Sequence, residues 1–225
     1  MTETIYLHGA GLNAESWGNV PGRALNLPGY GERPRALAPT VDAMADALED
    51  DIPAGAALVG HSLGGMVALT LAARLSERVR ALVLVDTPLS LRAPGAQRFG
   101  PTLAPLSVRL LGPKWIGRLV SYRIETPSSR ADFHRWLEAN DPDALTDALT
   151  AAATFDGEPL ARRIRMPVLA IYGTQSFLTR GPEKRRLKAV CPQARCVTFD
   201  TGHMIPLDRP AEMQTAITDF LAAHP

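Results

Sequence analysis

The chain has 225 residues, of which 46% are hydrophobic and 21% are charged, and its formal net charge at pH 7 is +1. This length and apolar content suit one α/β domain with a sizeable core and room for a small inserted subdomain. Because basic and acidic residues nearly cancel, the composition gives no support for nucleic acid or a membrane surface as a partner.

The start of the chain and its apolar runs indicate a soluble, cytoplasmic protein. Residues 1–7 contain no basic segment followed by a long apolar core, and no stretch reaches the roughly 18 apolar residues of a membrane span. We therefore expect no membrane partner and no secretion.

The two cysteines, Cys191 and Cys196, lie close together in the sequence. We expect two free thiols in a reducing compartment, with a local disulfide as the alternative. With no second cysteine pair and only scattered histidines, they cannot complete four metal ligands. No cofactor fingerprint occurs either, so the sequence predicts neither a metal nor a cofactor.

Short β-rich or apolar runs alternate with helical ones along the chain. The predicted strands are 5–7, a weak run at 23–25, 56–59, 81–85, 168–172 and 195–199. Runs of this kind, separated by helices, predict a parallel sheet of about six strands with helices on both faces. Thr40 is a plausible cap for a helix with one apolar stripe, and a last helix is predicted to begin at Pro210.

The interval 88–165 interrupts this alternation, because it holds many prolines and helical stretches but no convincing strand. We interpret it as a helical cap inserted into a core formed by residues 1–87 and 166–225. Its first part, 89–124, contains basic residues and no acidic residue. That stretch is either an ordinary solvated face or a docking surface for an anionic partner or substrate tail.

A G-x-S-x-G pattern occupies residues 60–64, directly after the predicted strand 56–59. Such a pattern turns a strand sharply into a helix and lifts one serine hydroxyl out of the fold. Its glycines tolerate the strained backbone and avoid collision with neighbouring elements. The apolar run 66–73 that follows is typical of a helix covering a sheet. Ser62 is therefore the candidate nucleophile.

Serine needs a histidine base within hydrogen-bond reach. His203 is the best candidate, because it follows the last predicted strand and so gives the order serine then histidine that accompanies this elbow. His61 belongs to the elbow itself and is expected to point away from the serine hydroxyl. His134 is expected on the cap surface and His224 at a frayed terminus.

A glycine-bearing loop, residues 8–11, follows the first predicted strand. The expected oxyanion donors are the backbone amides of Ala10 and of Leu63, the residue after the nucleophile. The alternative is a simple strand-to-helix turn. His8 is expected to be structural rather than catalytic.

Several of these features together resemble the α/β-hydrolase superfamily over essentially the whole chain except the cap. They are the elbow, His8-Gly9, the Leu-Pro-Gly-Tyr-Gly segment at 27–31, and Gly202-His203 before Arg209-Pro210. The stretch 11–17 further resembles the esterase branch that contains the pimeloyl-acyl-carrier-protein methyl ester esterases. The resemblance implies an α/β-hydrolase fold with a small helical cap.

The chain departs from that family in two ways. It reaches its His-Gly loop at residue 8, so the antiparallel hairpin that usually opens the fold is expected to be missing, and the segment 17–27 is too short for a full helix. The family also commonly supplies its acid in a Gly-x-x-Asp pattern after the strand 168–172. Here the matching run ends in Ser176, which cannot carry a negative charge.

Asp86 is the candidate acid in place of Ser176. It ends the predicted strand 81–85, a position from which some α/β hydrolases deliver the acid to the same histidine. An aspartate there can also simply bond backbone amides of a loop. The alternatives are Asp200 or Asp208, or no acid at all.

These residues predict a serine-nucleophile hydrolase that cleaves carboxylic esters through an acyl-enzyme. The substrate would be a small-molecule or acyl-chain ester, and an acidic carrier protein is conceivable if the basic stretch faces outward. The same groups also serve C–C bond or lactone hydrolysis or a lyase reaction. A binding protein that has lost turnover is the third alternative, motivated by Ser176. The candidate lining of an acyl pocket is Leu110, Leu111, Trp115, Phe133 and Trp136.

Overall fold

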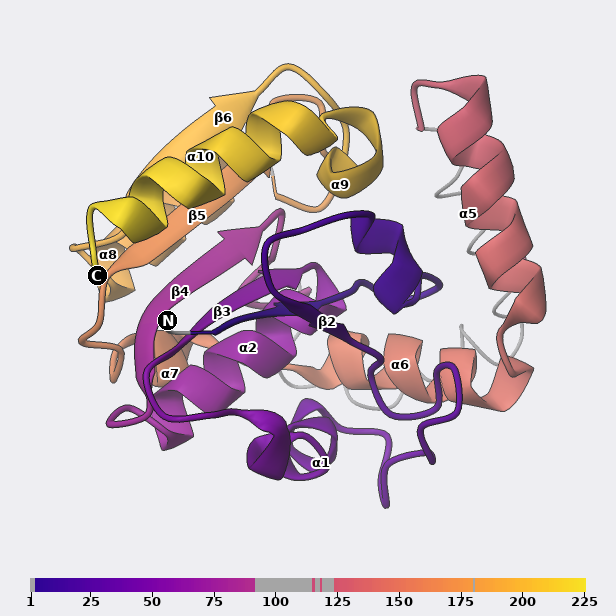
Figure 1. The fold of residues 1–225 in the computed structure, drawn as a ribbon, viewed down its shortest axis with the longest axis horizontal. Helices are drawn as coiled ribbons and strands as arrows, with labels where there is room; N and C mark the ends of the chain where they lie inside the picture. Colours follow the sequence, from indigo (N-terminus) through magenta and orange to yellow (C-terminus); the bar gives the residue numbers. More distant parts are fainter. Residues whose placement is uncertain (1–2, 92–114, 116–117, 119–123, 180) are drawn as a thin grey trace.

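A six-stranded parallel sheet forms the centre of the computed structural model, which describes residues 3–91, 115, 118, 124–179 and 181–225 (Figure 1). The strand order is β2-β1-β3-β4-β5-β6, and each neighbouring pair is parallel. The strands are β1 (Thr4–Leu7), β2 (Arg23–Leu25), β3 (Ala56–His61), β4 (Val79–Val85), β5 (Val168–Gly173) and β6 (Arg195–Phe199). The parallel sheet expected from the sequence is confirmed, including the weak run at 23–25.

Helices cover both faces of this sheet, and further helices stand beside it. The described helices are α1 (Val41–Asp46), α2 (Leu63–Arg74), α5 (Pro127–Ala139), α6 (Pro142–Thr154), α7 (Glu158–Ala161), α8 (Gly181–Val190), α9 (Ile205–Asp208) and α10 (Pro210–Ala222), with short 3-10 turns η1 (Ala14–Trp17) and η2 (Glu49–Asp51). Thr40 caps α1, because its side chain accepts a hydrogen bond from the Ala43 amide. The last helix begins at Pro210, as expected, since proline suits the first turn of a helix.

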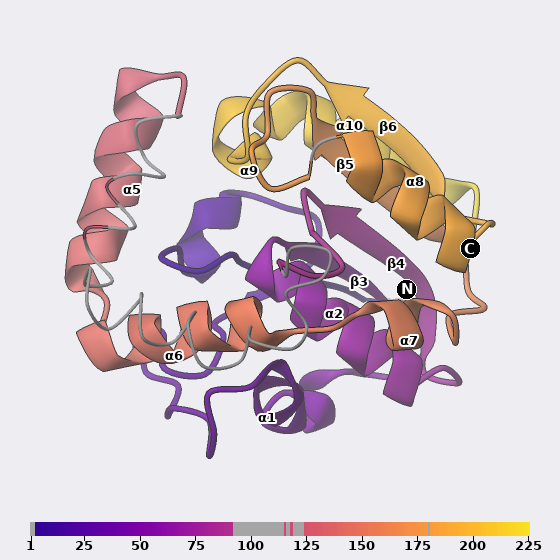
Figure 2. The same cartoon turned by 180° about the vertical axis from the view of Figure 1, so that it is seen from behind.

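The two faces of the sheet carry two separate apolar clusters. Along β3, Leu58 belongs to a cluster with α1, α2, α7 and α8, whereas Val59 belongs to a cluster with η1 and α10. This alternation follows from the period of two of a β-strand. Figure 1 shows α10 in front of the sheet, and Figure 2 shows α8 on the opposite side. The central strands are therefore buried from both sides.

β1 already lies inside the sheet, paired with β2 on one side and β3 on the other. The chain thus begins its described part in the second strand position of the sheet. The segment 17–27 holds the end of η1 and the strand β2 but no α-helix, as the sequence indicated.

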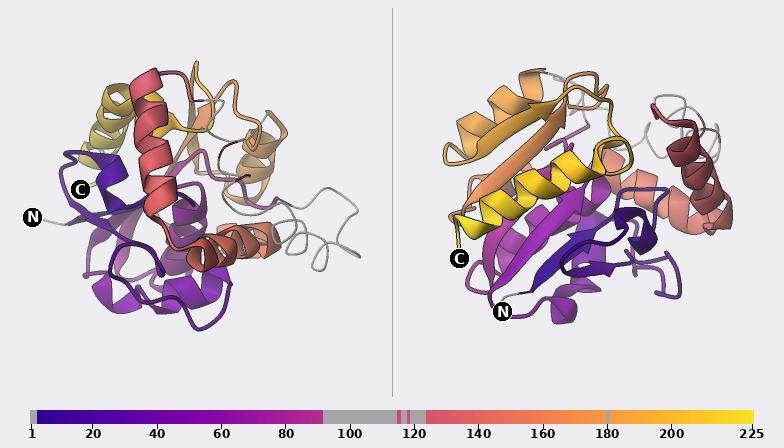
Figure 3. Two further views of the ribbon diagram at one scale, coloured as in Figure 1. Left: turned by 90° about the vertical axis from the view of Figure 1, so that its right-hand side faces the viewer. Right: turned by 45° about the horizontal axis from the view of Figure 1, so that its top comes forward.

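The interval between β4 and β5 is helical wherever it forms a described element, although these two strands pair directly. α5 and α6 stand at one end of the molecule (Figure 3). α6 contributes small apolar residues to the core cluster of α2, and α5 packs with the loops that follow β1 and β6. The division of the chain at residues 88 and 165 stays a prediction.

Ion pairs join this helical interval to the loops of the core. Arg35 binds Asp147 at 2.7 Å and Asp143 at 3.4 Å on α6. Arg209, next to α9, binds Glu125 just before α5 at 2.9 Å. A further ion pair joins Glu158 on α7 to Arg186 on α8 at 2.6 Å, so the interval is attached to the core along much of its described length.

Neither cysteine is in a disulfide. Cys191 is buried and Cys196 is partly exposed, and both are free thiols, as expected. No described helix combines the length and the apolar character needed to cross a membrane.

Candidate active site

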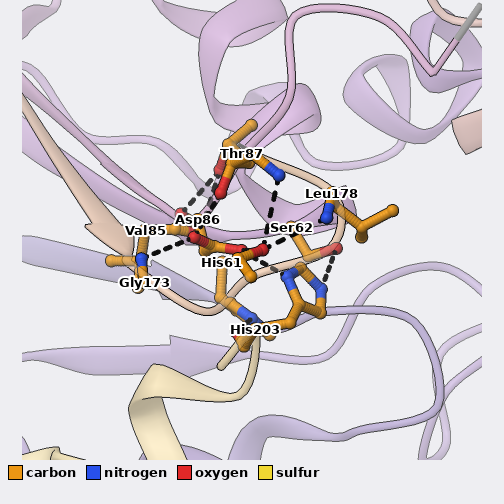
Figure 4. Close-up of polar contacts among 11 residues, drawn as sticks. His61, Ser62, Val85, Asp86, Thr87, Gly173, Leu178 and His203 are labelled. Atoms are coloured by element: carbon orange, nitrogen blue, oxygen red, sulfur yellow. Dashed lines mark hydrogen bonds and ion pairs between the residues drawn. The ribbon is translucent and has the colours of Figure 1, made fainter. Parts of the chain in front are cut away.

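Three polar side chains meet at the carboxyl edge of the sheet (Figure 4). Ser62 follows β3, Asp86 follows β4, and His203 lies in the loop after β6. The carboxyl ends of parallel strands share one edge, which is where open α/β sheets place their ligands. The fold therefore brings together residues that are up to 141 positions apart in the chain.

Ser62 occupies a sharp turn between β3 and α2. Its φ is 52°, a conformation that L-residues rarely adopt, and α2 begins at the next residue. The Ser62 amide donates to the Val85 carbonyl at 3.0 Å, which ties the turn to β4. A Cβ on Gly64 would collide with the backbone carbonyl oxygen of Leu7. The glycine of the motif is thus required by the close approach of α2 to β1.

The serine hydroxyl is within hydrogen-bond reach of His203. The Nε2 atom of His203 lies 3.0 Å from Ser62 Oγ, and its Nδ1 atom lies 2.6 Å from Asp86 Oδ2. Because a carboxylate can only accept, Nδ1 carries the proton and Nε2 is free to accept from the serine. Asp86 is fully buried and His203 is 5% exposed.

The Asp86 carboxylate accepts hydrogen bonds on both oxygens. Oδ1 accepts from the Gly173 amide at 2.9 Å and from the Thr179 hydroxyl, and Oδ2 accepts from the Ser176 hydroxyl at 2.5 Å as well as from His203. Burial by itself raises the pKa of Asp86, but the hydrogen bonds and charge of His203 and the two hydroxyls outweigh burial and lower this pKa. Asp86 is therefore an anion at neutral pH.

The other two carboxylates considered from the sequence lie elsewhere. Asp200 is exposed and accepts from Thr174 and Gln175, while Asp208 accepts from the Glu125 amide. The structure thus brings Asp86, and neither alternative, to His203. Sequence reasoning noted Ser176 only as a departure from the family, and it missed Thr179.

The remaining histidines have other surroundings. His61 donates from Nε2 to the His203 carbonyl at 3.0 Å, and burial lowers its pKa to about 3. His8 donates from Nδ1 to the Gly9 carbonyl and accepts on Nε2 from the Leu27 amide, and burial lowers its pKa to about 4. Both rings are neutral near pH 7 and neither contacts the Ser62 hydroxyl through these bonds. His224, expected at a frayed end, instead hydrogen-bonds the Phe220 carbonyl.

A cavity of about 190 Å³ opens beside Ser62. Its lining consists of Ala10, His61, Ser62, Leu63, Leu91, Leu149, Ala152, Phe177, Leu178, His203 and Met204. Ala10 and Leu63, whose amides are the expected oxyanion donors, both border it. A Cβ on Gly9 would lie 2.6 Å from the His61 ring, so this loop approaches the elbow as closely as glycine allows. Apart from Ser62 and two histidines, the lining is apolar.

The aromatic residues proposed for an acyl pocket are placed differently. Phe133 and Trp136 on α5 are buried in an apolar cluster with Leu12, and they are not among the residues that line the cavity. Trp115 is 58% exposed. Leu110 and Leu111 lie outside the described residues, as does most of the basic stretch 92–123. The helical interval contributes Leu91 and the α6 residues Leu149 and Ala152 to the described lining, and the rest comes from the end of β3, the loops of the core and the start of α2.

Among the residues that the structure describes, no group of three or more histidine, cysteine, aspartate or glutamate side chains could hold a metal ion. The hydrogen bonds of Ser62, His203 and Asp86 suit nucleophilic attack assisted by a base, next to an apolar cavity.

Comparison with known proteins gives consistent matches. Residues 5–214 match the model of the alpha/beta hydrolase family. A pimeloyl-[acyl-carrier protein] methyl ester esterase of Neisseria meningitidis serogroup C is 33% identical over 196 residues, covering 78% of this chain and 76% of that protein. The enzyme of the same name from Aromatoleum aromaticum is 30% identical over 251 residues, covering 97% and 98%.

Among solved structures, the enol-lactonase of Burkholderia xenovorans LB400 superposes with a TM-score of 0.84. It is 22% identical in sequence, and the match covers 98% of this chain and 91% of that one. This likeness concerns the fold alone.

Proposed function

Because the chain belongs to the alpha/beta hydrolase family, we propose that it is a carboxylic ester hydrolase in which Ser62 is the nucleophile and an acyl-enzyme is the intermediate. The observation that carries this proposal is the unbroken line of hydrogen bonds from Ser62 through His203 to Asp86. It is supported by the names of the relatives, which are methyl ester esterases.

Proton transfer follows from the orientation of His203. As the Ser62 oxygen attacks the ester carbonyl, its proton moves to Nε2, while Nδ1 keeps its proton and its bond to Asp86. The imidazolium so formed lies 2.6 Å from a buried anion, which stabilises its charge. When the tetrahedral intermediate collapses, the proton passes from Nε2 to the departing alcohol oxygen.

The carbonyl oxygen becomes negatively charged in this step. We assign the stabilisation of this charge to the backbone amides of Ala10 and Leu63. Both residues line the cavity: Ala10 lies in the loop after β1, and Leu63 directly follows Ser62. Leu63 is the first residue of α2, so its amide has no partner within the helix. In the second half of the reaction, water gives a proton to His203 and attacks the acyl carbonyl. The bond between the acyl carbon and Ser62 Oγ then breaks, His203 returns the proton to Ser62, and the acid is released.

The substrate we propose is a methyl ester on an acyl chain carried by an acidic carrier protein. The cavity is apolar except for its reactive groups, which suits an uncharged acyl chain. The names of the relatives supply the carrier protein and the methyl ester. We also propose that the protein acts in the cytoplasm, as the sequence predicts.

A fluorophosphonate probe tests the nucleophile directly, because it forms a covalent bond only with an activated serine. Wild-type protein should be labelled and Ser62→Ala should not, with equal thermal unfolding of both as the control. If well-folded wild-type protein is not labelled, this result would contradict the proposed serine hydrolase and favour a binding protein.

A panel of substrates tests the reaction. The protein should hydrolyse p-nitrophenyl esters and release methanol from an acyl-carrier-protein methyl ester faster than from the free methyl ester. Opening of lactones without hydrolysis of any ester would favour the alternative chemistry of the same fold.

A further inference from the structure

Two hydroxyl groups contact the Asp86 carboxylate, and neither belongs to the proposed line of proton transfer. Ser176 lies 2.5 Å from Oδ2, and Thr179 contacts Oδ1. Both residues are in the loop after β5, and they are only 1% and 3% exposed. Water therefore has little access to this site and cannot easily take the place of these hydroxyls.

The direction of the Ser176 hydroxyl is fixed by its other partners. Its oxygen accepts from the amides of Leu178 at 3.2 Å and Thr179 at 3.3 Å. A hydroxyl has one proton and two lone pairs. With both lone pairs used, the proton points to Asp86, and the turn that carries Ser176 holds it there.

The carboxylate thereby uses all of its accepting capacity. A carboxylate offers about four lone-pair sites, and Asp86 has four donors: one amide and one hydroxyl on Oδ1, one hydroxyl and the imidazole on Oδ2. Rotation of the carboxylate about its own axis would break several of these bonds at once. The arrangement favours a single orientation, with Oδ2 toward His203.

We propose that Ser176 and Thr179 are positioning residues for the reaction, which hold Asp86 ionised and turned toward Nδ1 of His203. This inference rests on the proposed function, and it assigns a role to the residue that stands where the acid was expected. Without the hydroxyls, the buried anion would be less well solvated and would bind a proton, or an imidazolium, more strongly. The His203–Asp86 pair would then take up a proton at higher pH.

The other titratable groups near Asp86 do not obscure this effect. Burial lowers the pKa of His61 to about 3, and burial raises the pKa of Tyr172 far above its ordinary value. Both groups keep one charge state across the range in which an esterase is assayed. The acid limb of the pH profile therefore reports the coupled pair.

The test compares Ser176→Ala, Thr179→Val and Thr179→Ser with wild-type protein on a p-nitrophenyl ester from pH 5 to 10. Ser176→Ala and Thr179→Val should each lower kcat by on the order of tenfold, the lower end of the effect of a hydrogen bond to a charged group, with little change in KM. Their acid limb should move to higher pH. Thr179→Ser, which keeps the hydroxyl, should restore both values.

Thr174→Val is the matched control. Thr174 is in the same loop, but its hydroxyl binds the exposed Asp200 rather than Asp86. Its loss should leave kcat and the pH profile unchanged. If Thr179→Ser is as impaired as Thr179→Val, packing rather than the hydroxyl matters, and the inference is wrong.

An NMR titration of the His203 imidazole in the same variants measures the protonation of the His203–Asp86 pair and requires no turnover. A midpoint that stays at its wild-type value in Ser176→Ala and Thr179→Val would overturn the inference even in an active enzyme. Failure of wild-type protein to hydrolyse esters or to react with the fluorophosphonate would instead overturn the proposed function. The two failures are therefore distinguishable.

Discussion

Replacing Asp86 by asparagine should nearly abolish turnover, because the surrounding hydrogen bonds orient the new amide group unfavourably toward His203. The Gly173 amide is a backbone donor that cannot turn away from Oδ1, whereas the Ser176 and Thr179 hydroxyls can rotate. We therefore expect the asparagine oxygen on the side of Gly173. Its NH2 group then faces Nδ1 of His203. A donor at that place favours the tautomer with the proton on Nε2, and Ser62 loses its base.

The size of the effect follows from this tautomer exchange. The corresponding change in a serine protease lowers turnover about 10⁴-fold, equivalent to about 5 kcal/mol of barrier. We expect a similar fall in kcat for Asp86→Asn with little change in KM, because the cavity lining is not altered. Steady-state hydrolysis of p-nitrophenyl butyrate measures both constants, and circular dichroism on heating checks that the variant is folded.

Asp200→Asn is the control for this experiment, since Asp200 is exposed and bonds to Thr174 and Gln175. It should retain wild-type kcat. A folded Asp86→Asn protein with kcat within tenfold of wild type would refute the reasoning, because His203 would then work without an anion beside it.

Four further results are expected. Gly64→Ala places a Cβ against the Leu7 carbonyl oxygen and should destabilise the fold by more than about 3 kcal/mol in urea unfolding. Gly181→Ala, where the nearest heavy atom is 3.8 Å away, should stay within about 0.5 kcal/mol of wild type. Ala152→Leu fills part of the cavity and should lower kcat/KM for p-nitrophenyl octanoate more than for the acetate; equal losses would place the acyl chain elsewhere. Asp86 has a lowered pKa in the folded state, so it contributes stability above the ordinary aspartate value and loses it on acidification. The free energy of unfolding should therefore fall below about pH 4 in wild type and fall less in Asp86→Asn, and identical slopes would contradict this assignment.

Much of the fold could be predicted because the central strands are largely apolar on both faces. The run 168–172 is buried at every residue, as a central parallel strand must be, and even the weak run 23–25 pairs with β1. Ser62 could be predicted as the candidate nucleophile because the sharp turn between β3 and α2 requires the glycines on either side of it. Asp86 was predicted from its position at a strand end, and the pairing of β4 with β5 puts it next to the loop that holds Ser176.

The lining of the cavity could not be predicted in the same way. Helical spacing identifies Phe133 and Trp136 as one face of a helix, but it does not say what that face packs against. In the structure they pack with Leu12. The contacts of Ser176 and Thr179 with Asp86 depend on a turn conformation and on a neighbouring strand, neither of which leaves a pattern in the sequence.

Ser62 and Asp86 are the described non-glycine residues whose φ is positive, at 52° and 42°. A conformation of this kind costs on the order of 1–3 kcal/mol at each residue, while a whole domain is stable by only about 5–15 kcal/mol. Glycine would relieve that strain at either position and would remove a reactive side chain with it. Selection of this chain for heat resistance alone would therefore favour an inert protein of the same shape. Engineering for stability should keep these two positions fixed and screen for activity at every round.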